Sequence, residues 1–190
     1  MKRRIWTVLI IWSFILFIPY PGYSDTSNIP KIKQTDLGLY IKAKEAFAKW
    51  QTNSGSVHIL DVRTPEEYIF VGHAPMARNI PVRLMNQRLT AERKKLVLEA
   101  NPNFVSAVKK YYQPFDKLLI MCRSGGRSAQ AVNLLKKAGF KYAYNIIDGF
   151  EGDTIKDTHS YYHGKRVKNG WKNAGVPWTF KLDPQLVYSP

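Results

Sequence analysis

The most informative segment of this chain is Leu118-Leu119-Ile120-Met121-Cys122-Arg123-Ser124-Gly125-Gly126-Arg127-Ser128. Apolar residues of strand length lead into a glycine-rich loop, and a helical pattern continues from Ser128 to Lys137. A loop between a strand and a helix can direct backbone N–H groups at one point, where the helix N-terminus adds partial positive charge. The sequence therefore predicts an anion-binding loop that begins with a cysteine.

Cys122 is the candidate nucleophile, because the thiolate is the reactive form of cysteine and such loops favour it. It is the only cysteine in the sequence, so an intrachain disulfide is not possible. A lone cysteine is otherwise usually a buried core residue, and that alternative stays open. The candidate anion-binding residues are the rest of the loop: Arg123, Ser124, Gly125, Gly126, Arg127 and Ser128.

The hydrophobic pattern predicts strands that alternate with helices along the chain. One helix begins with Thr64-Pro65-Glu66-Glu67, an N-cap followed by proline and a glutamate three residues after the cap. This alternation predicts an α/β fold with a parallel sheet of about five short strands and sites at the carboxyl ends of strands, where Cys122 lies. We expect helices over 39–50, 64–71, 88–100, 103–112 and 128–138, and strands over 57–62, 76–81, 118–122 and 141–147.

The N-terminal residues have the layout of a secretory signal peptide. Lys2-Arg3-Arg4 precedes an apolar run of 14 residues, Ile5 to Ile18, and small residues precede Asp25. We expect a signal peptide over 1–24, a flexible lead-in over 25–37, export to the periplasm, and no stable membrane span after cleavage. The alternative is an uncleaved anchor, although a membrane span usually needs about 20 apolar residues.

The composition is strongly basic, with 29 lysines and arginines against 14 acidic residues. Removal of the signal leaves a net charge of +12, since it holds three of the basic residues and no acidic one. An exported protein rarely meets nucleic acid, so we expect none as a partner. The charge favours anionic small molecules, acidic partners or an anionic membrane surface, and a solvated basic surface accounts for most of the lysines.

Four segments in order resemble the single-domain, exported rhodanese-like sulfurtransferases, and the resemblance covers residues 38–178. It sets the domain at 38–180, with an insertion over 151–170 on the active-site edge and a C-terminal tail over 181–190. Met76 and Phe150 stand where that family usually has glycine. The segments are Leu60-Asp61-Val62-Arg63-Thr64-Pro65-Glu66-Glu67-Tyr68, Gly72-His73-Ala74-Pro75 with Asn79-Ile80-Pro81, the Cys122–Ser128 loop, and Gly149 with Gly170-Trp171 and Ala174-Gly175-Val176-Pro177.

The resemblance implies that Cys122 takes a sulfur atom from an anionic donor such as thiosulfate and becomes a persulfide. A thiol or cyanide then removes the sulfur, no cofactor takes part, and an exported redox protein is a candidate partner. Arg123 and Arg127 would hold the donor, while Asp61 and Arg63 would support the loop. The implied fold has three layers, with the sheet between helices.

Several of these side chains also have structural interpretations. Arg127 could tie the loop to a carboxylate, Asp61 could order its own loop or pair with a loop arginine, and Arg63 could pair with Glu67. His73 is more typical of a turn than of a catalytic base. His159 and His163 have metal-ligand spacing if helical, but the sequence shows no third ligand, so we predict no metal.

Two other functions remain open. A cysteine phosphatase or arsenate reductase would use a similar loop, but phosphatases of this fold have five residues between cysteine and arginine, and here there are four. Met121 also stands where a phosphatase usually has histidine. The second alternative is a sulfur-binding relay module that is loaded by one protein and unloaded by another, because a fold alone does not fix a function.

Overall fold

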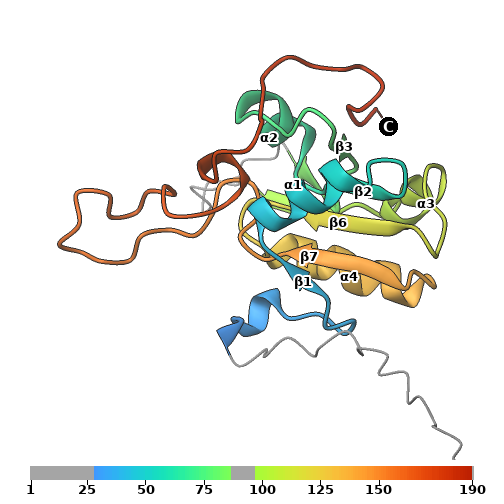
Figure 1. The fold of residues 1–190 in the computed structure, drawn as a ribbon, viewed down its shortest axis with the longest axis horizontal. Helices are drawn as coiled ribbons and strands as arrows, with labels where there is room; N and C mark the ends of the chain where they lie inside the picture. The colour runs from blue at the N-terminus through green and yellow to red at the C-terminus, as the bar shows by residue number, and fades with distance from the viewer. Residues whose placement is uncertain (1–27, 87–96, 190) are drawn as a thin grey trace, which may run out of the picture.

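A computed structural model describes residues 28–86 and 97–189, and Figure 1 shows their arrangement. A parallel sheet lies between layers of helices, as the alternating sequence pattern predicts. The elements are η2 (Lys31–Lys33), β1 (Tyr40–Ile41), α1 (Ala43–Thr52), β2 (Val57–Asp61), α2 (Pro65–Phe70), β3 (Arg78–Asn79), β4 (Arg83–Asn86), β5 (Val97–Ala100), α3 (Phe104–Lys109), β6 (Lys117–Met121), α4 (Gly126–Lys137), β7 (Tyr142–Ile146) and η3 (Trp171–Asn173).

Within the described residues the sheet has five strands in the order β1-β7-β6-β2-β3, and each neighbouring pair is parallel. The central strand β6 pairs with β2 through Ile59↔Leu119 and with β7 through Leu119↔Tyr144. Because all strands run the same way, their carboxyl ends share one edge, and Cys122 follows β6 there. The predicted fold class is confirmed.

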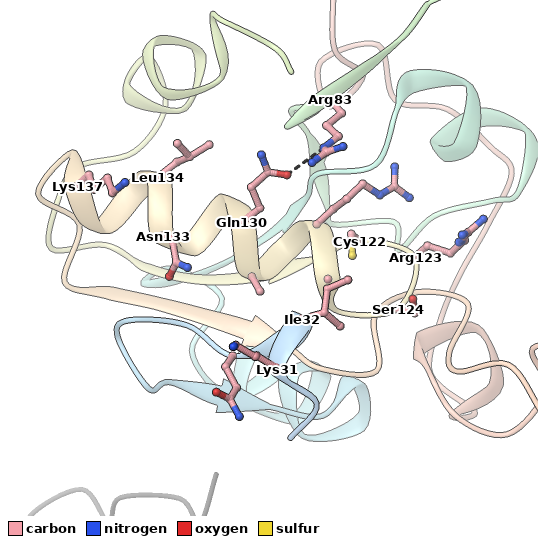
Figure 2. A pocket seen from close by; sticks show the side chains of 14 residues that line it. Lys31, Ile32, Arg83, Cys122, Arg123, Ser124, Gln130, Asn133, Leu134 and Lys137 are labelled. Atoms are coloured by element: carbon pink, nitrogen blue, oxygen red, sulfur yellow. Dashed lines mark hydrogen bonds between the residues drawn. The ribbon is translucent and has the colours of Figure 1, made fainter. Parts of the chain in front are cut away.

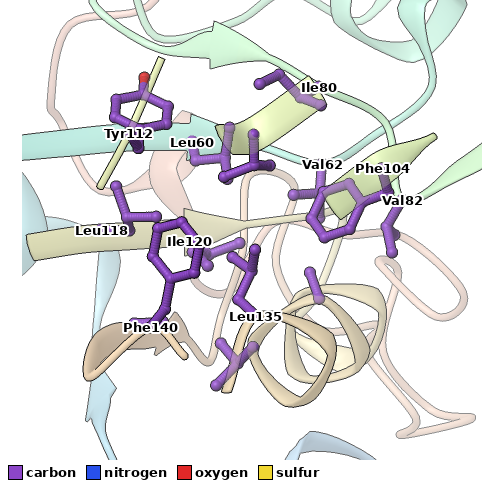
Figure 3. Packing of buried hydrophobic residues seen from close by; sticks show 14 of the residues in the cluster. Leu60, Val62, Ile80, Val82, Phe104, Tyr112, Leu118, Ile120, Leu135 and Phe140 are labelled. Carbon is purple, nitrogen blue, oxygen red and sulfur yellow. The ribbon is translucent and has the colours of Figure 1, made fainter. Parts of the chain in front are cut away.

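Side chains alternate between two buried layers along each strand. Leu118 and Ile120 face a cluster formed with α3 and α4, which Figure 3 shows. Leu119 and Met121 face the opposite cluster, which includes residues of α1 and the buried Trp171 of η3. Continuous burial of β6 on both faces explains its uninterrupted apolar sequence.

The predicted helix over 88–100 is wrong at its end, and residues 88–96 lie outside the described part. Val97–Ala100 forms β5, which pairs antiparallel with β4 through Arg83↔Ala100 and Asn86↔Val97. Pairing with a distant segment overrides the helical pattern of this charged stretch. Strand β1 was also missed, because two residues at a sheet edge give no periodic signal.

The predicted signal peptide lies outside the described residues. In the described part of the predicted lead-in, η2 packs against α4, and Lys33 is buried. The amide side chain of Asn133 on α4 accepts a hydrogen bond from Asp36 N. Between residues 28 and 189, leaving out 87–96, the structure has no helix long and apolar enough to cross a membrane.

We predict that Ile120→Ala lowers the free energy of unfolding by about 2–5 kcal/mol, because it leaves a cavity in the core between β6 and α4. Ile32→Ala is the matched control, since Ile32 is 76% exposed and should change stability by no more than about 0.5 kcal/mol. Urea unfolding of both variants checks this. Equal losses would contradict the assignment of the core.

Candidate active site

The cysteine loop turns directly from β6 into α4, and Cys122 lies at the bottom of it. Its sulfur accepts a hydrogen bond from the backbone N–H of Gly125 over 3.2 Å, and the residue is 2% exposed. Gly125 has φ of +97°, and a Cβ there would lie 2.3 Å from the carbonyl oxygen of Ile147. Glycine is therefore required where the loop reverses and presents its N–H to the sulfur.

Asn145 of β7 is the buried residue that holds this loop in place. Its Nδ2 donates to the carbonyl oxygens of Lys33 and Gly125, over 2.8 and 3.1 Å. Two carbonyl partners fix the orientation of the Asn145 amide, so its Oδ1 accepts a hydrogen bond from the Ser128 hydroxyl over 2.7 Å. The Ser128 oxygen also lies 3.4 Å from the Cys122 sulfur. Asn145 thus joins the lead-in, the loop and the first turn of α4.

The segment after β7 packs against the other side of the loop. Phe150 N donates to the carbonyl oxygen of Cys122 over 2.7 Å, and Glu151 N donates to that of Arg123 over 2.9 Å. A Cβ at Gly149 would lie 2.5 Å from the same Cys122 oxygen. The close approach requires glycine at this position, so the loop backbone is held from both sides.

Asp61 and Arg63 do not line the cavity at Cys122. They form a fully buried ion pair, with 2.6 Å between Arg63 Nη2 and Asp61 Oδ2. Arg63 also donates to the carbonyl oxygen of Gly72 and lies 4.0 Å above the ring of Phe150. The backbone N–H of Phe150 donates a hydrogen bond to the carbonyl oxygen of Cys122. The ion pair therefore contacts the loop indirectly, through the packing of Arg63 on the Phe150 ring. A supporting role for both residues stays a prediction.

Arg127 is engaged by Glu67 of α2 through two hydrogen bonds of 2.6 and 2.7 Å. Burial opposes the charge on both groups, but the hydrogen bonds and charge attraction prevail, so the pKa of Glu67 is lowered and the pKa of Arg127 is raised. The structure therefore shows the carboxylate tie that the sequence left open for Arg127. Arg63 pairs with Asp61 and not with the Glu67 carboxylate.

The cavity above Cys122 has a volume of about 670 Å³, and Figure 2 shows the side chains around it. Arg123 is exposed at this cavity, and no carboxylate among the described residues forms an ion pair with it. Gly125 and Ser128 are buried behind the loop surface. The predicted site residues in the lining are Cys122, Arg123, Ser124, Gly126 and Arg127.

A second cavity of about 610 Å³ lies across η2 and shares Ser124 and Ile32 with the first. Its lining includes Asp153 and Arg166 from the insertion over 151–170. The base of this segment therefore borders the cysteine loop, while the rest of it extends away from the domain in Figure 1.

The histidines with metal-ligand spacing are not brought to the site. His159 and His163 lie in turns of the insertion and not on a helix. The backbone N–H of His159 donates to the carboxylate of Asp157. The ring of His163 contacts the backbone carbonyl oxygen of Asp157. His73 is buried and stacks on Tyr68 at 3.9 Å between ring centroids, so it is a packing residue.

Comparisons with known proteins show which family this chain resembles. A family model described as Rhodanese-like domain matches residues 44–155, which include the whole cysteine loop. Thiosulfate sulfurtransferase 16, chloroplastic, of Arabidopsis thaliana is 38% identical over 48% of this chain and 68% of that protein. YrkF of Bacillus subtilis (strain 168), named as a proposed sulfur carrier protein, is 34% identical over 74% of this chain and 60% of that protein. The crystal structure of Rv0390 from M. tuberculosis matches with a TM-score of 0.55 and 25% identity, over 72% of this chain and 95% of that chain.

We predict that Asn145→Ala costs about 2–4 kcal/mol, because it leaves buried polar partners unsatisfied. Hydrogen exchange should also become faster at the Gly125 amide, while the amides of β6 stay protected. Asn53→Ala, at an exposed position, is the control and should leave both measurements unchanged. An unaltered Gly125 amide in the Asn145 variant would contradict the supporting role.

We predict that Glu67→Gln lowers stability by about 1–3 kcal/mol at pH 7 because it removes the charge that holds Arg127. The pKa of Glu67 is lower in the folded chain than its ordinary value of 4.5, so the ionised group contributes stability above pH 4.5. This contribution is lost as pH falls through the folded pKa.

The difference between wild type and Glu67→Gln should therefore shrink between pH 4.5 and pH 3, as chemical denaturation can measure. Glu151→Gln is the control, since the Glu151 carboxylate forms no ion pair within the described residues. A stability difference that is equally large at pH 3 and pH 7 would rule out the charged pair as its source.

Proposed function

This chain belongs to the rhodanese-like domain family, which supports a role in sulfur transfer, and we propose that it transfers sulfur through a persulfide on Cys122. The observation that carries the proposal is the position of the Cys122 sulfur. It lies beneath a cavity at the carboxyl end of β6, with the Gly125 N–H directed at it.

The first step loads the cysteine. The Cys122 thiolate attacks the outer sulfur of an anionic donor such as thiosulfate, and a new S–S bond forms as the S–S bond of the donor breaks. Sulfite leaves with the electron pair of the broken bond. No external oxidant or reductant is needed, and the reaction is nucleophilic catalysis through a covalent intermediate.

The second step unloads the cysteine. A thiolate or cyanide attacks the terminal sulfur of the persulfide, and Cys122 leaves as a thiolate, ready for another donor. The persulfide carries its negative charge on the terminal sulfur, where the helix N-terminus and the loop amides favour an anion. The guanidinium of Arg123, which has no carboxylate ion-pair partner among the described residues, supplies mobile positive charge for the donor at the mouth of the cavity.

The geometry favours sulfur transfer over phosphate chemistry. Cys122 and Arg127 are separated by four residues, and Arg127 binds Glu67 through both terminal nitrogens. An arginine held in this way has fewer free N–H donors for a phosphate than an arginine directed at the nucleophile. A relay module that exchanges sulfur with a protein is the second candidate, which the name of the relative YrkF supports.

We predict that thiosulfate adds one sulfur atom to the wild-type protein and none to Cys122→Ser, because Cys122 is the only thiol in the sequence. Intact-mass spectrometry of the full chain measures the addition, and cyanide should reverse it. Circular dichroism of the variant confirms that it is folded. Sulfur uptake that persists in Cys122→Ser, or no uptake by wild type with a titratable thiol, would refute the proposed thiosulfate chemistry.

A further inference from the structure

The cavity above Cys122 is much longer than the proposed small donor requires. Its lining follows α4 from Gly126 at the cysteine loop to Lys137 at the far end of the helix. Figure 2 shows Gln130, Leu134 and Lys137 of this lining along the helix. At a rise of 1.5 Å per residue this part of the helix is about 17 Å long. An extended peptide of about five residues covers the same length, since each residue spans about 3.3 Å. We call this space the α4 groove.

The walls of the α4 groove come from separate parts of the chain. Lys31 and Ile32 of η2 form one side, and Arg83 of β4 lies on the other. The floor is the surface of α4, where Gln130 accepts a hydrogen bond from Arg83 over 3.0 Å. Amide and guanidinium groups along the groove can bind the backbone and carboxylates of a peptide.

The charge of the α4 groove has one sign throughout. No aspartate or glutamate is among its described lining residues, whereas cationic side chains are placed along its whole length. Glu67 compensates one of them, Arg127, but Lys31, Arg83 and Lys137 have no ion pair with a carboxylate in the described residues. A small anion at Cys122 would leave the distant Lys137 unused. The cationic lining residues are Lys31, Arg83, Arg123, Arg127 and Lys137.

We propose that the α4 groove binds an acidic peptide segment of a protein thiol that exchanges sulfur with Cys122. The inference rests on the proposed sulfur transfer and names the class of partner for the same site. Carboxylates of the segment contact Lys31 and Lys137, and the adjoining cysteine of the partner reaches the loop. Positive potential along the groove also speeds the encounter with such a partner.

The transfer step balances without a further reagent. The partner thiolate attacks the terminal sulfur of the Cys122 persulfide, a new S–S bond forms on the partner, and the S–S bond to Cys122 breaks. Cys122 leaves as a thiolate, and the partner holds the persulfide. The reverse reaction loads Cys122, so the groove serves exchange in either direction.

The test uses two synthetic hexapeptides and the full chain loaded with sulfur. One peptide has four acidic residues followed by glycine and cysteine, and the other has the matching amides. We expect faster sulfur transfer to the acidic peptide, measured by intact mass at low salt. Lys31→Gln and Lys137→Gln should each lower this rate about threefold to fivefold at subsaturating peptide, the size of one exposed ion pair.

Lys109→Gln is the matched control, because Lys109 is exposed on α3 and lies outside the groove. Equal rates for both peptides, or an equal effect of all three lysine substitutions, would overturn the proposal. Binding to anionic phospholipid vesicles that depends on Lys31 and Lys137, without peptide binding, would also overturn it and assign the groove to a membrane surface.

A binding measurement separates this proposal from the proposed function. A fluorescent acidic peptide with serine in place of cysteine needs no sulfur chemistry, and its anisotropy should rise with wild type and rise less with Lys31→Gln and Lys137→Gln. Absence of sulfur on thiosulfate-treated wild type refutes the proposed function by itself. If protein that carries sulfur on Cys122 binds neither the acidic nor the amide peptide, the proposal for the α4 groove is refuted and the proposed function is not.

Discussion

The structure around Cys122 depends on the buried amide of Asn145. Its two N–H groups bind carbonyl oxygens from η2 and from the cysteine loop, and its oxygen binds Ser128 at the start of α4. The loop contains consecutive glycines and would otherwise sample many conformations. Together with the backbone hydrogen bonds from Phe150 and Glu151, this side chain on a neighbouring strand holds the loop with its Gly125 N–H directed at the sulfur.

The charged residues around the site are of two kinds: those paired with another charge inside the fold and those exposed at the cavity. Asp61 and Arg63 are neutralised in the interior, and Glu67 binds Arg127, so these four side chains fix elements relative to one another. Arg123 lies exposed at the cavity. This division concentrates available positive charge at the entrance above the sulfur and along the α4 groove, while the interior stays balanced.

The sequence predicted the sheet and the loop because both have strong local signals. The apolar run before Cys122, its glycines and the helical period after it fix β6, the loop and α4. Asn145 was missed, since a single asparagine in a strand gives no sign of its distant partners. The ion-pair partner of Arg127 was also not predicted, because Glu67 is 60 residues away and meets it only in the folded chain. Strand β5 was not predicted for the same reason, because its pairing with β4 is a tertiary contact.

The most direct test is a crystal structure of the protein after treatment with thiosulfate, with anomalous scattering used to locate sulfur. We expect one added sulfur atom bonded to Cys122 Sγ at about 2.05 Å and directed into the cavity at the mouth of the loop. An intact donor bound without a covalent bond, or an added sulfur turned away from the loop, would contradict it.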